Sequence, residues 1–170
     1  MQGTRELHAG PYRACTALTG VRREVAGCLQ ICYIGRMAGQ ARKLRLHVLE
    51  EKFAVSKLPQ FAELPQVFTK GENCFVARTD SELSIICPEF MAPTNVQQEA
   101  GWRCIQVVGE MPLSEVGVLA NLTGPLAKAG IPILAISTFD TDYLFVMEEN
   151  LVPAVQVIQK AGHEFVHTVP

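Results

Sequence analysis

Apolar and polar positions follow two different periods along the chain, and these periods place the expected strands and helices. Residues 44–49 nearly alternate, as a half-buried strand does, and residues 53–55 continue the strand after an acidic turn. Residues 74–79 and 82–87 predict two further strands joined by a tight turn. Residues 59–68 are short and interrupted by proline, so we expect at most two helical turns there.

The second half of the chain has a longer and more regular pattern. Residues 102–110 predict a strand, and Ser114 is placed to cap a helix that begins at Glu115. Apolar residues recur every three or four positions through that helix, which predicts one buried face. Residues 131–138 and 142–147 predict a pair of neighbouring strands.

The last elements complete a recognisable order. Asn150 is placed to cap a final helix that ends at Gly162, and residues 163–169 predict a closing strand. The order over residues 102–169 is then β-α-β-β-α-β, the ferredoxin-like split βαβ arrangement. The polar residues 93–101 before it predict a linker.

Part of the same order occurs earlier in the chain. Residues 79–83 stand in the first half where residues 138–142 stand in the second. We therefore expect an α+β protein made of two related ferredoxin-like modules, the first with a degenerate helix. Residues 44–100 would form the first module and residues 101–170 the second.

Charge is unevenly distributed over the 170 residues. Residues 1–43 carry seven Lys or Arg and two Asp or Glu, giving +5, whereas residues 44–170 carry eight and fifteen, giving −7. The acidic body lacks the clustered cations that nucleic acid requires, so we expect no nucleic-acid partner. No apolar run is long enough for a membrane-spanning helix, so we expect no membrane partner either.

The first 43 residues show no lasting period, because glycines interrupt them repeatedly. They are either an organellar transit peptide or an upstream extension of the reading frame, with Met37 as an alternative start. We favour the extension, and we expect this unassigned basic segment to be disordered and to lie outside the fold.

Six cysteines would allow a disulfide framework, but the chain is not short and lacks the apolar core of a signal peptide. Cys28 and Cys32 have no second pair to complete a zinc site. We therefore expect reduced thiols, a cytoplasmic protein and no metal. Organellar import by the basic segment remains the alternative.

A catalytic function finds little support in the residues. No histidine lies in a motif that would set it beside a nucleophile, and no phosphate-binding glycine loop is present. His163 and His167 would lie about 13 Å apart on a strand, too far to share a metal. We expect no enzyme and no cofactor.

A binding loop is the remaining candidate. Residues 111–117 join a strand to a helix N-terminus, where free backbone N–H groups can hold a carboxylate. Gly117 either lets a ligand approach closely or serves ordinary helix packing. Asp142, across the sheet, offers a negative charge to an ammonium or guanidinium group. Such a site suits a zwitterionic amino acid.

Residues 114–120, 124–131 and 136–143 together resemble an ACT domain. They are most similar to the aspartokinase-like branch, which includes the CASTOR arginine sensors of the TOR pathway and many small stand-alone prokaryotic proteins. Residues 75–89 resemble the first module of those small tandem proteins, and the resemblance covers about residues 44–168.

The resemblance implies a regulatory fold that binds amino acids between paired modules without catalysis. Two modules rather than four imply that a homodimer completes the interfaces. Ser114 and Thr141 depart from the sensor pattern, so the identity of the amino acid stays open. The ligand-binding candidates are Ser114, Glu115, Val116, Gly117, Val118, Ser137, Thr138, Phe139 and Asp142.

Our leading hypothesis is therefore a non-catalytic, amino-acid-binding allosteric sensor that dimerises and is recognised by a downstream protein partner. One alternative is a dimerisation or protein-interaction module that binds no ligand. Another is a stand-alone relative of an aspartokinase regulatory domain that works with a separate kinase.

Overall fold

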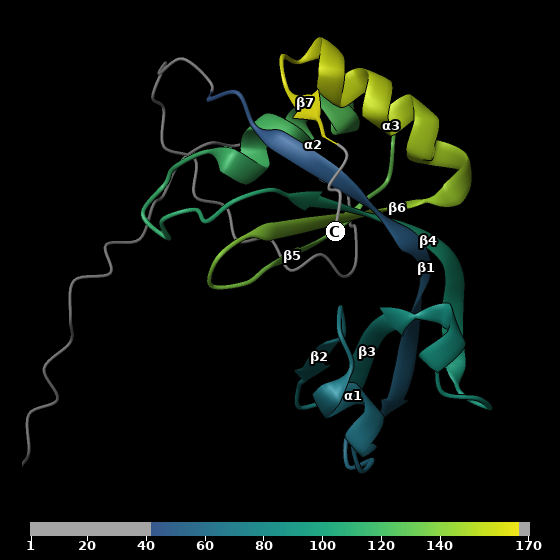
Figure 1. Ribbon diagram of the computed structural model, residues 1–170. Helices are drawn as coiled ribbons and strands as arrows, with labels where there is room; N and C mark the ends of the chain where they lie inside the picture. Colours follow the sequence, from purple (N-terminus) through teal and green to yellow (C-terminus); the bar gives the residue numbers. More distant parts are fainter. Residues whose placement is uncertain (1–41, 167–170) are drawn as a thin grey trace, which may run out of the picture. The chain divides into compact units, whose positions relative to one another are not determined.

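The computed structural model describes residues 42–166 (Figure 1). Most of the basic segment for which we predicted disorder lies outside these residues, as do residues 167–170. The elements in chain order are β1 (Arg45–Pro59), α1 (Gln66–Lys70), β2 (Phe75–Arg78), β3 (Glu82–Pro88), the 3-10 turn η1 (Glu89–Met91), β4 (Gln97–Val107), α2 (Val118–Lys128), β5 (Leu134–Ser137), β6 (Asp142–Met147), α3 (Glu148–Lys160) and β7 (Glu164–Phe165).

The seven strands of the described residues belong to one sheet, in the order β2-β3-β1-β4-β6-β5, with β7 parallel to the beginning of β1. The predicted α+β ferredoxin-like class is confirmed. Two long strands, β1 and β4, run antiparallel between the part with α1 and the part with α2 and α3 (Figure 1). We call β2, β3, α1 and the adjoining ends of β1 and β4 the first module. The second module contains α2, α3, β5, β6 and β7 with the other ends of β1 and β4.

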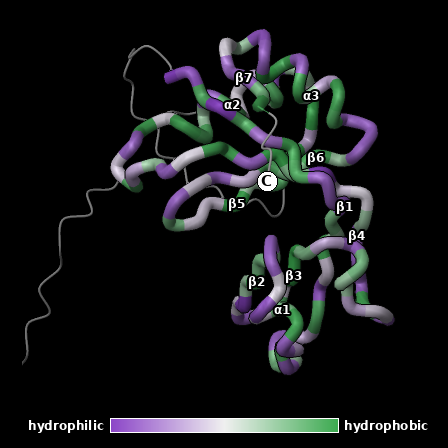
Figure 2. Tube along the Cα trace, in the orientation of Figure 1, coloured by the Kyte–Doolittle hydropathy of each residue, from purple (hydrophilic) through white to green (hydrophobic). Residues whose placement is uncertain are grey.

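The core of the second module lies between the sheet and its two helices. Leu122 and Leu126 of α2 and Ile158 of α3 are fully buried against β4 and β6. Figure 2 shows apolar and polar segments alternating along both helices, as expected for helices with one buried face. Gly130 and Gly162 follow these helices with positive φ angles, and each completes a Schellman-type end.

The first module has a smaller core. Its only helix of α type, α1, has five residues and contributes one buried side chain, Phe68, which packs with Leu83 and Ile85 of β3. The prediction of at most two helical turns in this region is therefore confirmed. Because so short a helix covers little of the sheet, neighbouring loop residues complete the core.

A third cluster joins the two modules on the opposite face of the sheet. Phe53 and Phe145 are fully buried and meet edge to face, with ring centroids 5.3 Å apart. Phe75 of β2 contacts both Phe145 and Tyr143 of β6. These aromatic contacts hold the two modules together away from the helices.

Two predictions about β1 and β4 are wrong. The acidic residues 50–51 do not turn the chain, because β1 continues through them to Pro59 with register shifts against β4. Residues 97–101, predicted as linker, are the beginning of β4. Residues 97–99 pair with β1, whereas residues 50–51 lie in a bulge between the paired residues Val48 and Lys52, which interrupts the register without ending the strand. The proposed boundary at residue 100 falls within β4, and the division into residues 44–100 and 101–170 stays a prediction.

Both predicted helix caps are wrong. Helix α2 begins at Val118, after Gly117, and not at Glu115 after Ser114. Helix α3 begins at Glu148 directly after β6, two residues before Asn150. Neither helix has a side-chain cap, so the short polar residues gave misleading start positions.

Strand β5 spans only Leu134–Ser137, so the strand predicted over residues 131–138 is shorter than expected. Strand β7 spans Glu164–Phe165, and residues 167–169 of the predicted closing strand lie outside the described residues. Within residues 42–166, no helix combines the length and apolarity needed to cross a bilayer.

Candidate ligand-binding site

The loop between β4 and α2 forms one wall of the candidate site. It ends at Gly117, whose φ of +87° lies in the left-handed region. The carbonyl of Gly117 accepts the first helical hydrogen bond, from the N–H of Asn121 at 2.9 Å. Glycine is needed here because a side chain would clash in this backbone conformation. The left-handed turn explains why a glycine occupies position 117, for which the sequence alone offered two explanations.

The hairpin between β5 and β6 forms the other wall. The Thr138 hydroxyl donates to the carbonyl of Thr141 at 2.9 Å, and the Thr141 hydroxyl donates to the carbonyl of Val107 at 2.5 Å. The second bond is buried, and it fastens the hairpin to the end of β4. The N–H of Met111 donates to the carbonyl of Asp140 at 2.9 Å, so the loop and the hairpin are joined directly.

A buried carboxylate lies at the base of this hairpin. Ser137 and Asp142 are cross-strand partners, and the Ser137 hydroxyl donates to Asp142 Oδ1 at 2.5 Å. Asp142 is only 8% exposed. No described cation pairs with it, so its negative charge is held in place by a neutral donor. Two of the candidate residues are thus in direct contact, and their role in binding a ligand stays a prediction.

An open cavity of about 590 Å³ lies between the loop and the hairpin. Two predicted residues, Ser114 and Phe139, line it. Its two acidic residues, Glu110 and Asp140, were not among the candidates, because Glu110 ends the predicted strand 102–110 and Asp140 lies between two predicted strands. The lining residues are Glu110, Met111, Pro112, Leu113, Ser114, Phe139 and Asp140.

The remaining predicted residues have other surroundings. Val118 packs into the core of the second module, and Val116 is 69% exposed. Glu115 forms an ion pair with Arg42, at 2.8 Å between Nη1 and Oε2. This pair ties the loop to the residues just before β1, so the carboxylate of Glu115 is already engaged. Arg42 was not selected from the sequence because no local pattern connects it with a loop so far along the chain.

The charge of the cavity is negative. Glu110 and Asp140 form no ion pair with any residue of the described chain, and Asp142 lies in the adjoining strand. Carboxylates without a cationic partner favour a ligand with a positive group. Apolar side chains from Met111 and Leu113 complete the lining, as in most small-molecule sites.

The described residues 42–166 contain neither a thiol activated for nucleophilic attack nor a cluster of metal-ligating side chains. Burial raises the pKa of the Cys87 thiol to about 11 and raises that of Cys104 further. Such thiols are protonated near neutral pH and therefore poor nucleophiles. No group of three or more His, Cys, Asp or Glu side chains in these residues is arranged to hold a metal ion.

Comparison with known proteins identifies the family. Residues 97–160 match the family model of the ACT domain. The chain contains an ACT domain in this region. The match runs from the beginning of β4 to the end of α3, so the ACT domain contains both the loop and the hairpin that form the cavity.

Part of the chain is similar to a cytosolic arginine sensor, in agreement with the predicted resemblance to the CASTOR proteins. The human cytosolic arginine sensor for mTORC1 subunit 1 is 35% identical over 60 residues, which are 35% of this chain and 18% of the sensor. The matched residues therefore span less than a fifth of the length of the human sensor.

Two solved structures show the same fold. Protein Atu0741 from Agrobacterium tumefaciens is 29% identical, with a TM-score of 0.70, over 76% of this chain and 97% of that one. An aspartate kinase from Clostridium acetobutylicum is 11% identical, with a TM-score of 0.50, over 68% of this chain and 34% of the kinase. The second likeness concerns the fold alone.

Proposed function

We propose that this ACT-domain protein is a non-catalytic regulator that binds an amino acid in the cavity between the β4–α2 loop and the β5–β6 hairpin. The observation that carries the proposal is the negatively charged, apolar-lined cavity within the matched ACT domain. The name of the human relative, an arginine sensor, supports an amino acid as the ligand.

Each end of an amino acid has a partner in this arrangement. Backbone N–H groups of the loop before α2 hold the ligand carboxylate, helped by the positive end of the helix. Asp142 is not among the lining residues, but from the adjoining strand β6 its carboxylate attracts the ammonium group or a cationic side chain, and the Ser137 hydroxyl orients that carboxylate. Glu110 and Asp140 add to the attraction at the mouth of the cavity. The ligand is bound and not transformed.

The exposed apolar residues around the cavity support a second copy of the chain as its cover. Leu113 is 72% exposed, Val116 69% and Phe139 76%. Apolar side chains this exposed and this close together mark an interaction surface. In a homodimer, the ligand would contact both copies and stabilise one arrangement of them, which a partner protein recognises. Without the ligand, the same surface would serve a dimerisation module, the second candidate function.

The thiols support a cytoplasmic location for this protein. Cys74, Cys87 and Cys104 are unpaired in the described chain, as is usual where thiols are kept reduced.

Thermal unfolding of the full chain against each of the twenty amino acids tests the proposal. A ligand at 100 times its Kd stabilises the folded state by about 2.7 kcal/mol, which raises Tm by several degrees. We expect one amino acid, or a few related ones, to do so. If none of the twenty amino acids changes Tm and light scattering shows a dimer, the protein is a dimerisation module that binds no amino acid.

Asp142→Asn tests the site itself. It removes the charge but keeps an oxygen for the Ser137 hydroxyl, so we expect a folded protein whose Tm no longer responds to the amino acid. Asp80→Asn is the matched control, because Asp80 is an exposed residue of the corresponding hairpin in the first module. An unchanged ligand response in Asp142→Asn would remove Asp142 from the site.

A further inference from the structure

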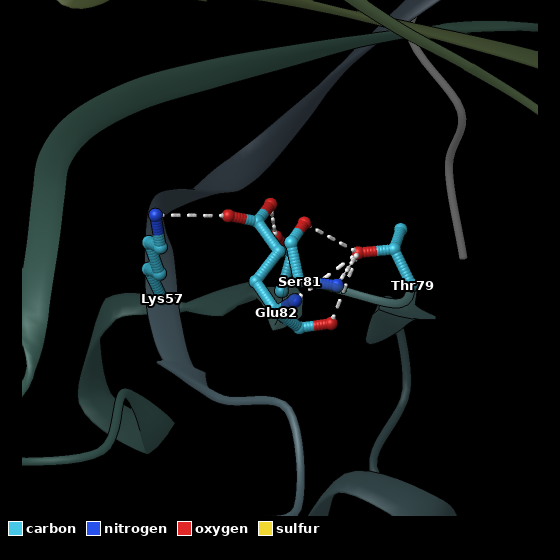
Figure 3. Close-up of polar contacts among 5 residues, drawn as sticks. Lys57, Thr79, Ser81 and Glu82 are labelled. Carbon is cyan, nitrogen blue, oxygen red and sulfur yellow. Dashed lines mark hydrogen bonds and ion pairs between the residues drawn. The ribbon is translucent and has the colours of Figure 1, made fainter.

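The hairpins of the two modules have the same hydrogen-bond pattern. In the second module, the N–H of Thr138 donates to the carbonyl of Thr141 at 2.9 Å, and the Thr138 hydroxyl accepts from the N–H of Thr141 at 3.3 Å. In the first module, Thr79 and Glu82 repeat these contacts, and the Thr79 hydroxyl accepts from the N–H of Glu82 at 3.2 Å (Figure 3). The two hairpins are therefore structural counterparts.

The strand registers extend this correspondence to neighbouring positions. Arg78 pairs with Leu83 across the first hairpin, as Ser137 pairs with Asp142 across the second. Arg78 is therefore the counterpart of Ser137. Each of the two residues lies at the end of its strand, just before the turn.

The side chain of Arg78 spans the space between its hairpin and the preceding loop. Its Nη1 donates to the carbonyl of Gln60, and its Nη2 donates to the carbonyl of Ala62 at 2.9 Å. Both carbonyls belong to the loop from β1 to α1, the counterpart of the loop from β4 to α2. The space between loop and hairpin is thus bridged in the first module.

The second module has a different residue at this position. Ser137 is too short to cross to the loop, and its hydroxyl is used by Asp142. There, the cavity of about 590 Å³ lies between the loop and the hairpin. The two modules therefore differ at this position, because Arg78 reaches the preceding loop in the first module and Ser137 bonds within its own hairpin in the second.

We propose that Arg78 is a built-in occupant of a guanidinium-binding site formed by the β1–α1 loop of the first module. The chemistry fits a guanidinium group, because its planar fork donates in two directions at once and stays charged at every physiological pH. A lysine ammonium at the same place acts as a point charge and does not match two separated carbonyls equally well. The proposal stands independently of what the second module binds.

Chemical rescue of Arg78→Ala tests this occupancy. We expect the variant to unfold a few degrees below the wild-type protein, because two loop carbonyls lose their donors. Ethylguanidinium chloride, added at concentrations too low to denature the wild-type protein, should raise the Tm of the variant selectively. Urea and ethylammonium chloride should not. Lys70→Ala, which removes an exposed cation from nearby α1, is the control and should not respond to ethylguanidinium.

Equal responses of Arg78→Ala and the wild-type protein to ethylguanidinium would overturn the proposal, because the added ion would then have found no vacated site. Arg78→Lys is a second, independent test, and it does not require the Arg78→Ala variant to fold. Its Tm should be lower than that of the wild-type protein, since one ammonium replaces the fork. A Tm equal to that of the wild-type protein would show that any cation suffices, and would also overturn the proposal.

Discussion

Phe75 of β2 packs edge-on against Tyr143 of β6, with ring centroids 4.9 Å apart, although β3, β1 and β4 separate the two strands within the sheet. Strands so far apart in one sheet meet only if the sheet curls strongly, and strand twist with bulges provides such curvature. The bulged strands β1 and β4 lie at the centre of this curl. The aromatic contact therefore couples the two modules through side chains as well as through shared strands.

Loss of this contact should destabilise the whole fold. We expect Phe75→Ala to lower the free energy of unfolding by about 2 kcal/mol, less than for a fully buried phenylalanine because Phe75 is half-buried. Urea unfolding followed by tyrosine and tryptophan fluorescence measures the change. Phe61→Ala is the control and should have little effect, because Phe61 is 89% exposed. Equal losses in the two variants would contradict the coupling.

The left-handed turn at Gly117 predicts opposite effects for two glycine substitutions. Gly117→Ala should cost about 1–2 kcal/mol, because its φ of +87° is unfavourable for any residue with a side chain. Gly124→Ala should instead stabilise α2 by up to about 1 kcal/mol, since Gly124 is helical and an added Cβ meets no atom within 4 Å. Denaturant midpoints of both variants check the signs, and a stabilising Gly117→Ala would refute the backbone argument.

The buried thiols predict a loss of stability in alkaline solution. The pKa of Cys87 in the folded protein is raised to about 11 by burial, so the folded state binds the thiol proton more tightly than the unfolded state. The contribution is complete below the ordinary thiol pKa and is lost as the pH rises through about 11. We expect Tm to fall from about pH 8.5 upward.

Removal of both thiols is the control for this pH dependence. Cys87→Ala combined with Cys104→Ala should show a shallower fall of Tm between about pH 8.5 and 10.5 than the wild-type protein. Because both side chains are fully buried, the double variant starts from a lower Tm, and the slopes are compared, not the absolute values. Identical slopes would show that other groups cause the loss.

Features that depend on neighbouring residues were predictable. The alternation in residues 82–87 and the helical period after Gly117 follow from which side chains must leave water, and both elements are present. The hairpin correspondence between residues 79–83 and 138–142 was also visible, because turn chemistry is local. The pairing of Ser137 with Asp142 follows from their positions at the two sides of such a turn.

Local reasoning failed where several backbone solutions were available. Ser114 and Asn150 are good helix caps in isolation, but α2 and α3 begin elsewhere because the sheet and core fix where each helix must start. The acidic residues 50–51 stay extended for the same reason, since β4 supplies hydrogen-bond partners on both sides of them. Tertiary pairing outweighs the preferences of a few residues.

The sequence by itself determined the elements, their order, the two related modules and the loop and hairpin of the candidate site. Only the tertiary structure decided that Phe75 meets Tyr143, that Arg42 holds Glu115, and that Arg78 reaches the loop from β1 to α1. Periodicity records which face of an element is buried, whereas these contacts join residues distant in sequence or depend on the reach of one side chain. No local pattern carries that information.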